Sequence, residues 1–272
     1  MLITVFVFLG VEGASVYSRY AQKREDVGRA TVLGFLGVLA VFASVTVVSY
    51  GILPRAEIAE LRQPSMAGVL EEAVGGWGTV FVSTGLVVSV LGAYLAWTLM
   101  AAEVLFVVAA DDDMPRFLGR RNAAGAPVAS VLMTTVLIQL VLLVTLASEN
   151  AFDFALNMTS ALSLFPFVLA AGYALRLAVT RETYDERPEG RTRELVVAAV
   201  ATLYTLFLLV AAGPRYVLLS LVVYAPGTLL FVRARREQGR RLFSPRETVV
   251  LAVSVLGAVV GVVALVAGWI TV

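Results

Sequence analysis

Long runs of apolar residues separated by short polar segments dominate this sequence of 272 residues. A helix needs about 20 apolar residues to cross the hydrocarbon core of a bilayer, and every run except the first is long enough. The pattern therefore predicts an all-α polytopic membrane protein. Its eight predicted spans are residues 2–17, 30–52, 77–108, 127–147, 153–178, 194–212, 215–232 and 247–271.

The composition agrees with a membrane protein and excludes several kinds of catalytic and metal-binding site. Hydrophobic residues make up 59% of the chain, above the ~45–50% of a soluble domain, and the mean hydropathy is +0.87. There is no Cys and no His, which excludes disulfides, thiolate or imidazole metal ligands, Cys nucleophiles and Ser/His pairs. We therefore expect no enzyme activity, no metal site and no cofactor, and nothing supports nucleic-acid binding.

The basic residues alternate between the connecting segments. Eighteen of the 21 Lys and Arg residues lie in 18–29, 109–126, 176–193 and 233–246. The positive-inside rule puts these four segments in the cytoplasm. The N-terminus of this sequence would then be external, and the first span would run inward, as an even-numbered helix of a longer parent would.

The first apolar run contains one carboxylate, Glu12, between Gly10 and Gly13. A charged side chain inside a span costs ~2.5–3.5 kcal/mol on insertion scales, and two glycines weaken a helix by roughly 1 kcal/mol each. Non-helical backbone at membrane depth is tolerated where it lines a cavity. We therefore predict a broken helix here, with Glu12 as the leading functional residue. In the alternative, Glu12 snorkels or pairs with a neighbouring span, and the glycines are packing notches.

Small residues recur at helical spacing in two other spans. Gly85, Ser89 and Ala93 share one face of the third span, and we expect this face to pack on the broken first span. Gly257 and Gly261 form a similar pair in the last span, which predicts packing or a dimer contact.

Two motifs carry a resemblance to a known family. Phe8-Leu-Gly-Val-Glu-Gly-Ala14 resembles the unwound sixth helix of basic amino acid antiporters of the amino acid–polyamine–organocation superfamily, most closely the arginine/ornithine antiporters. The second motif is Gly92-Ala-Tyr-Leu-Ala-Trp-Thr-Leu-Met-Ala-Ala-Glu103. The following Asp111-Asp-Asp-Met-Pro115 and Asn122-Ala-Ala-Gly-Ala-Pro127 are similar to the intracellular segment of the same family.

The resemblance implies a fold. Such transporters contain two five-helix repeats of inverted topology with the substrate between two broken helices, the LeuT-like arrangement. Residues 1–178 would be the second five-helix repeat, starting with its broken helix, and residues 179–272 would be three peripheral C-terminal helices. The first repeat, with its glycine-rich first helix, would then be supplied elsewhere, so this chain would be a truncated or split half.

The resemblance also implies site residues. Trp97 would help to enclose the substrate beside Gly10, and a cation between Trp97 and Phe6 would gain ~1–2 kcal/mol per ring when desolvated. Phe6 stands where an arginine/agmatine antiporter has a tryptophan, which weakens the platform without abolishing it. Glu12 would couple the bound cation to the gate.

Other polar residues of the spans are candidates for the transport pathway. They are Tyr94, Glu103, Asn157 and Ser160. Asn157 and Ser160 share one helical face, where they could line the pathway or bond across helices, and the sequence does not decide between these roles.

The implied function is transport of cationic amino acids across the plasma membrane, as an exchange of arginine against ornithine by alternating access. The expected partners are these amino acids, the lipid bilayer and a separately encoded N-terminal half, without which the chain would be inactive. The alternative from another class is a non-transporting membrane subunit or the remnant of a permease. An adjacent reading frame for five spans would favour the split transporter.

Overall fold

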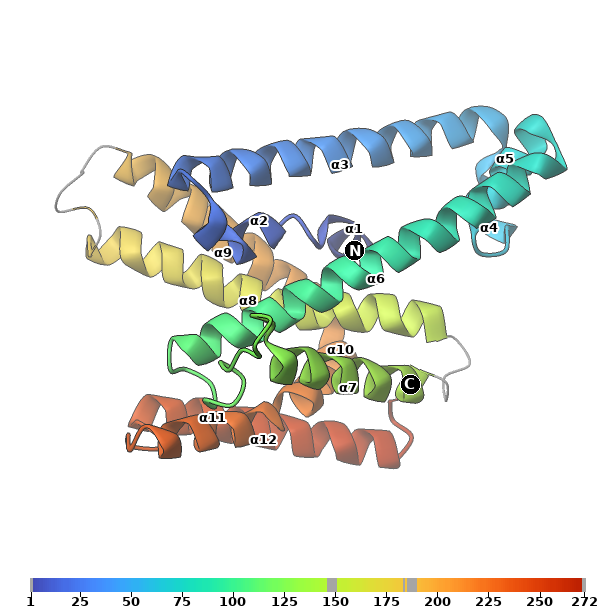
Figure 1. Cartoon of the computed structure of the whole chain (residues 1–272). Helices are drawn as coiled ribbons and strands as arrows, with labels where there is room; N and C mark the ends of the chain where they lie inside the picture. Colours follow the sequence, from blue (N-terminus) through green and yellow to red (C-terminus); the bar gives the residue numbers. More distant parts are fainter. Residues whose placement is uncertain (1, 146–150, 183, 185–189, 271–272) are drawn as a thin grey trace. The chain divides into compact units, whose positions relative to one another are not determined.

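The structure, a computed structural model, describes residues 2–145, 151–182, 184 and 190–270. All regular elements in these ranges are helical, as predicted (Figure 1). In chain order they are α1 (Leu2–Phe8), α2 (Gly13–Val16), the 3-10 helix η1 (Ser18–Tyr20), α3 (Arg24–Ile52), α4 (Arg55–Glu60), α5 (Ser65–Val74), α6 (Gly76–Ala110), α7 (Val128–Thr145), α8 (Ala151–Thr180), α9 (Arg191–Ala211), α10 (Gly213–Tyr224), α11 (Gly227–Glu237) and α12 (Pro245–Val266).

Within the described residues, six segments are long and apolar enough to cross a membrane. They are Glu25–Ile52, Gly76–Ala110, Ala151–Thr180, Arg191–Ala211, Gly213–Glu237 and Pro245–Val266. A shorter apolar helix, Val128–Leu143, lies in the predicted span 127–147. These helices confirm the polytopic membrane class. Residues 146, 147 and 271, at the ends of two predicted spans, lie outside the described residues, and the division into 1–178 and 179–272 stays a prediction.

Two of the predicted spans are interrupted. The first, 2–17, consists of α1 and α2 with four residues between them. The other, 215–232, contains the junction between α10 and α11 at Ala225 and Pro226. Pro226 has no amide hydrogen, so it cannot continue the helical hydrogen-bond ladder from α10.

The chain folds as two compact units. One unit contains Met1–Leu9, Val108–Phe117 and Val136–Val272. In it, α8 packs along α9, α1 and α10 contact α8, and α10 packs on α12. A small core forms where Leu164, Leu208 and Ala212 are buried, and Leu2 and Val5 of α1 pack against it. Apolar burial therefore joins the first helix of the chain to α8 and α9.

A proline inside α8 is compensated from another helix. Pro166 lacks the amide that would bond the Leu162 carbonyl one turn earlier. Instead, the Tyr224 hydroxyl donates to the Leu162 oxygen at 2.7 Å, and the ring of Tyr224 lies edge-on to Phe165 with centroids 5.5 Å apart. A carbonyl that the proline leaves unpaired at membrane depth is thus satisfied by a side chain of α10.

The glycine pair of the last span is a packing contact within this unit. A Cβ atom at Gly261 would lie 2.8 Å from the Val222 side chain and 3.1 Å from the Leu218 carbonyl oxygen, so only glycine fits without a shift. Gly257 faces Leu221 with the same effect. Of the two predicted roles, the structure shows packing of α12 against α10.

The other unit contains Gly10–Val107 and Leu118–Thr135. In it, α3 contacts α2 and α5. The turn from α5 into α6 is tight, because a Cβ atom at Gly78 would lie 2.7 Å from the Leu70 carbonyl oxygen. The Thr79 hydroxyl donates to the Glu71 carboxylate at 2.8 Å across the same turn. These contacts fix the direction in which the long helix α6 leaves this turn.

Candidate functional site

The first apolar run is broken where the sequence predicted it. Helix α1 ends at Phe8 and α2 begins at Gly13. Gly10 has φ +110°, a backbone conformation that residues with a side chain rarely adopt. The amide of Gly13 bonds the Gly10 carbonyl at 3.0 Å, which closes a short turn in place of a helical turn. The prediction of non-helical backbone between Gly10 and Gly13 is confirmed.

Glu12 satisfies an amide of the same broken segment. The N–H of Gly10 donates to Glu12 Oε2 at 2.7 Å. The break leaves this amide without a helical partner, and an unsatisfied N–H at membrane depth is costly. The carboxylate thus caps its own chain, a partner that neither sequence interpretation of Glu12 included. Its coupling role stays a prediction.

Trp97 of α6 lies directly against this segment. Its Cζ2 atom is 3.5 Å from the position that a Cβ atom on Gly10 would take, and Met100 Sδ is 3.3 Å from the equivalent position on Gly13. The two glycines therefore allow the backbone of the break to approach α6 closely. The structure brings together Gly10, Glu12 and Trp97, three of the predicted site residues, and 43% of Trp97 remains exposed.

The broken segment approaches α6 further along the helix than the sequence predicted, at Trp97 and Met100. Gly85, Ser89 and Ala93 are exposed, and the space around Gly85 is open. The expectation that this small-residue face packs on the broken span is therefore wrong. The glycines that permit close contact are those of the broken segment, so α6 can present large side chains there.

The remaining candidates are placed as follows. Phe6 lies on α1 and Tyr94 on α6, and both rings are exposed. On α8, Asn157 Nδ2 donates to the Asp153 carbonyl and Ser160 Oγ to the Leu156 carbonyl, each at 2.8 Å. Both side chains thus bond to their own helix, and Ser160 is fully buried. A role of these residues in a pathway stays a prediction.

Glu103 forms an ion pair with Arg19. Arg19 comes shortly after the broken segment in the chain. Glu103 lies near the end of α6, and 12% of its side-chain surface is exposed. Tyr20 completes the cluster, since Arg19 donates to its hydroxyl at 2.8 Å and that hydroxyl donates to Glu103 at 3.5 Å. The guanidinium groups of Arg19 and Arg121 lie 5.3 and 4.4 Å from the Phe106 ring centroid. The cluster therefore ties the end of the broken segment to the end of α6.

Sequence reasoning missed Arg19 and Tyr20. The signal was present, because the predicted topology puts the end of the first span and the end of the third span on the same membrane face. A basic residue just after the first span and an acidic residue near the end of the third span are expected to form an ion pair if the two spans are neighbours. The sequence did not show that they are neighbours.

Replacement of Glu103 by glutamine is expected to lower the free energy of unfolding by about 1–2 kcal/mol. It leaves Arg19 without its counter-charge at a mostly buried position, and partial exposure of Arg19 keeps the loss below the ~3–5 kcal/mol of a fully buried pair. Glu25→Gln is the matched control, because its pair with Arg29 is exposed and 3.9 Å long. Denaturant titration of both variants measures the difference, and equal losses would contradict a special role of the Arg19 pair.

In the described part of the chain, no group of three or more Asp, Glu, His or Cys residues could hold a metal ion. The polar groups at the break are instead one carboxylate, the backbone and the indole N–H of Trp97. This set suits recognition of a small organic cation by stacking and charge.

Comparisons with known proteins place the chain in a family. The profile of the family described as Amino acid permease matches residues 1–214. An arginine/ornithine antiporter of Pseudomonas aeruginosa is 41% identical over 277 residues, which cover 100% of this chain and 58% of that protein. A putative arginine/ornithine antiporter of Escherichia coli is 41% identical over 92% of this chain and 52% of its own length.

A further relative transports another amino acid. The L-lysine transport protein of Corynebacterium glutamicum is 38% identical over 98% of this chain and 56% of its own length. The chain thus spans a little over half the length of these relatives, and no solved structure matches it. The chain belongs to the amino acid permease family, and its relatives are transporters rather than enzymes.

Proposed function

We propose that this chain forms part of an exchanger of cationic amino acids, with arginine and ornithine as the substrate pair. The observation that carries the proposal is the position of Trp97, whose indole ring lies on the non-helical backbone at Gly10. Interrupted helices are typical of substrate sites in transporters of this kind. The names of the relatives from P. aeruginosa and E. coli support arginine and ornithine, and that of the C. glutamicum relative supports a cationic side chain.

In this proposal the substrate cation stacks on Trp97. A desolvated cation over an indole ring gains ~1–2 kcal/mol. Glu12 leaves the Gly10 amide when the gate moves and thereby couples binding to alternating access. Tyr94, Glu103, Asn157 and Ser160 line or support the pathway.

The rest of the site comes from a segment that this chain does not match in its relatives. Because the chain covers 58% of the P. aeruginosa antiporter, we propose that it requires a complementing N-terminal half and is inactive alone. We further propose a plasma-membrane location with the N-terminus of this sequence external, since 18 of 21 basic residues lie in four segments that share one predicted face.

The test is arginine/ornithine exchange in proteoliposomes. The chain is reconstituted alone and together with the part of the P. aeruginosa antiporter that it does not match. Exchange is expected only in the second case. Robust exchange by residues 1–272 alone would overturn the half-site proposal, and failure of the well-folded pair would favour a non-transporting membrane subunit or a remnant.

Trp97→Leu in the active pair is expected to weaken arginine binding by roughly 5- to 30-fold, because a cation–π contact of ~1–2 kcal/mol is lost. Binding of a neutral amino acid is expected to weaken less. Trp77→Leu is the matched control, since it makes the same change on α6 about 30 Å from Trp97 along the helix. Arginine affinity unchanged in Trp97→Leu, measured by isothermal titration, would move the substrate platform elsewhere.

A further inference from the structure

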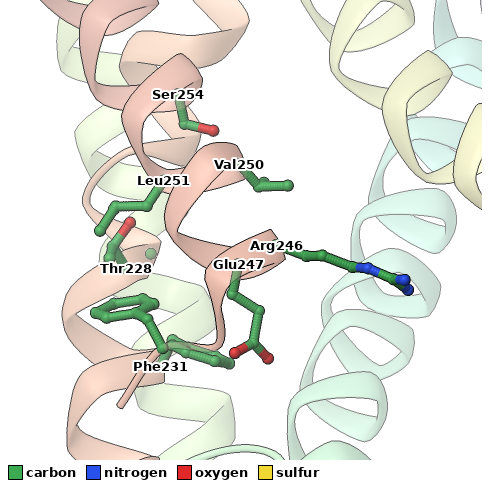
Figure 2. Close-up of a pocket in the computed structure, with 9 residues that line it drawn as sticks. Thr228, Phe231, Arg246, Glu247, Val250, Leu251 and Ser254 are labelled. Atoms are coloured by element: carbon green, nitrogen blue, oxygen red, sulfur yellow. The ribbon is translucent and has the colours of Figure 1, made fainter.

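A cavity of about 380 Å³ lies between α11 and α12, and none of its lining residues belongs to the broken helix (Figure 2). Its lining is mostly apolar and includes Phe231, Phe243, Val250 and Leu251. Both helices belong to segments that are apolar enough to cross a membrane. No part of the proposed exchange uses it.

One acidic residue lines the cavity, and its charge is already compensated. Glu247 Oε1 accepts a hydrogen bond from Arg235 at 2.8 Å, and Oε2 accepts the Ser244 amide at 2.6 Å as part of a capping box. Arg235 also lies over the Phe231 ring at 4.9 Å, and Phe231 contacts Phe243 with ring centroids 5.5 Å apart. The charges of Arg235 and Glu247 thus compensate each other.

Arg246, which also lines the cavity, has no such partner. Its side chain extends away from the Glu247 carboxylate (Figure 2), and among the described residues no ion pair or hydrogen bond engages it. Arg236, Arg240 and Arg241 come shortly before it in the chain, in the last turn of α11 and the connection to α12. The N-terminal end of the 22-residue helix α12 adds partial positive charge at the same place. Among the described residues, Arg246 thus gives this apolar cavity a positive charge that no ion pair compensates.

We infer that this cavity binds an anionic phospholipid. An acyl chain occupies the apolar space along Phe231, Val250 and Leu251, and Arg246 pairs with the phosphate of the head group at the membrane surface. Basic pockets between transmembrane helices are suited to such head groups. The charge complementarity selects an anionic lipid over a zwitterionic one with the same acyl chains. The inference does not depend on the exchange activity.

The test is native mass spectrometry of the full chain in mild detergent. Phosphatidylglycerol and phosphatidylcholine with identical acyl chains are added in turn. We expect phosphatidylglycerol to bind about fivefold more tightly, the effect of one basic residue at an anionic surface. Arg246→Ala is expected to remove this preference. Arg193→Ala, which removes another exposed arginine at the start of α9, is the matched control and should leave it unchanged.

Two further experiments separate the binding of the acyl chain from the binding of the head group. Leu251→Trp fills the cavity and should weaken the binding of both lipids, whereas inorganic phosphate should not compete with phosphatidylglycerol. Circular dichroism confirms that each variant is folded, and Arg246 is exposed, so its replacement leaves the packing intact. Equal binding of the two lipids, or equal effects of Arg246→Ala and Arg193→Ala, would overturn the inference, as would displacement of the lipid by phosphate.

Discussion

Replacement of Glu12 by alanine is expected to slow arginine exchange by roughly 5- to 150-fold in the complemented transporter, with arginine binding close to that of the unsubstituted protein. The variant leaves the Gly10 amide unsatisfied in the conformation described, where Glu12 Oε2 accepts its hydrogen at 2.7 Å. Such a loss costs ~1–3 kcal/mol and shifts the balance between conformations by that factor. Separate measurement of exchange in proteoliposomes and of binding by calorimetry checks the result.

Glu12→Gln divides the role of the side chain into two parts. The amide oxygen of glutamine can still accept the Gly10 N–H, but it carries no charge. Exchange by this variant at nearly the normal rate would mean that Glu12 acts as a cap of the broken segment. Exchange as slow as in Glu12→Ala would mean that the charge is needed. A parallel fall of binding and exchange in Glu12→Ala would contradict the coupling role.

Gly10→Ala is expected to weaken arginine binding and to lower the midpoint of thermal unfolding. An alanine at φ +110° carries strain of about 1–3 kcal/mol, and the new methyl group would sit 3.5 Å from Trp97. The strain is relieved by a change in the backbone that supports the indole ring. We therefore expect arginine affinity to fall by roughly 5- to 150-fold, measured by titration of the complemented transporter.

Gly13→Ala is the matched control for this variant. Gly13 begins α2 and is not among the glycines with positive φ, and its added methyl group would lie 3.3 Å from the flexible end of Met100. The side chain of Met100 can give way, so the cost should be much smaller. If Gly10→Ala behaves like Gly13→Ala in both affinity and unfolding, the conformation of Gly10 is not what positions Trp97.

The fold class and most spans could be predicted from the sequence because insertion into a bilayer depends on local hydropathy. The predicted 77–108 corresponds to Gly76–Ala110, and 153–178 to Ala151–Thr180. The helix predicted at 30–52 begins earlier, at Arg24, since a helix continues into water where hydropathy no longer reports it. The break at Gly10 was also predictable, because glycines and a carboxylate within a span are a local signal.

Contacts between helices could not be predicted in the same way. The Arg19 pair joins residues that are far apart in sequence, and the small-residue face at Gly85 is exposed although its spacing suits packing. Helix association in lipid depends on which helices are neighbours, which hydropathy does not encode. The hydrogen bond from the Gly10 amide to the Glu12 carboxylate is local, but it depends on the turn geometry and not on residue type alone.

The hydrogen bond between Tyr224 and the Leu162 carbonyl also constrains the order in which Tyr224 and Pro166 can be replaced during evolution. If Tyr224 changes first, the carbonyl that Pro166 leaves unpaired has no donor, and the protein is destabilised. If Pro166 changes first, α8 regains a backbone amide for that carbonyl, and the tyrosine becomes dispensable. In related sequences that have lost both residues, we therefore expect that Pro166 was replaced before Tyr224. The opposite order would pass through a destabilised protein.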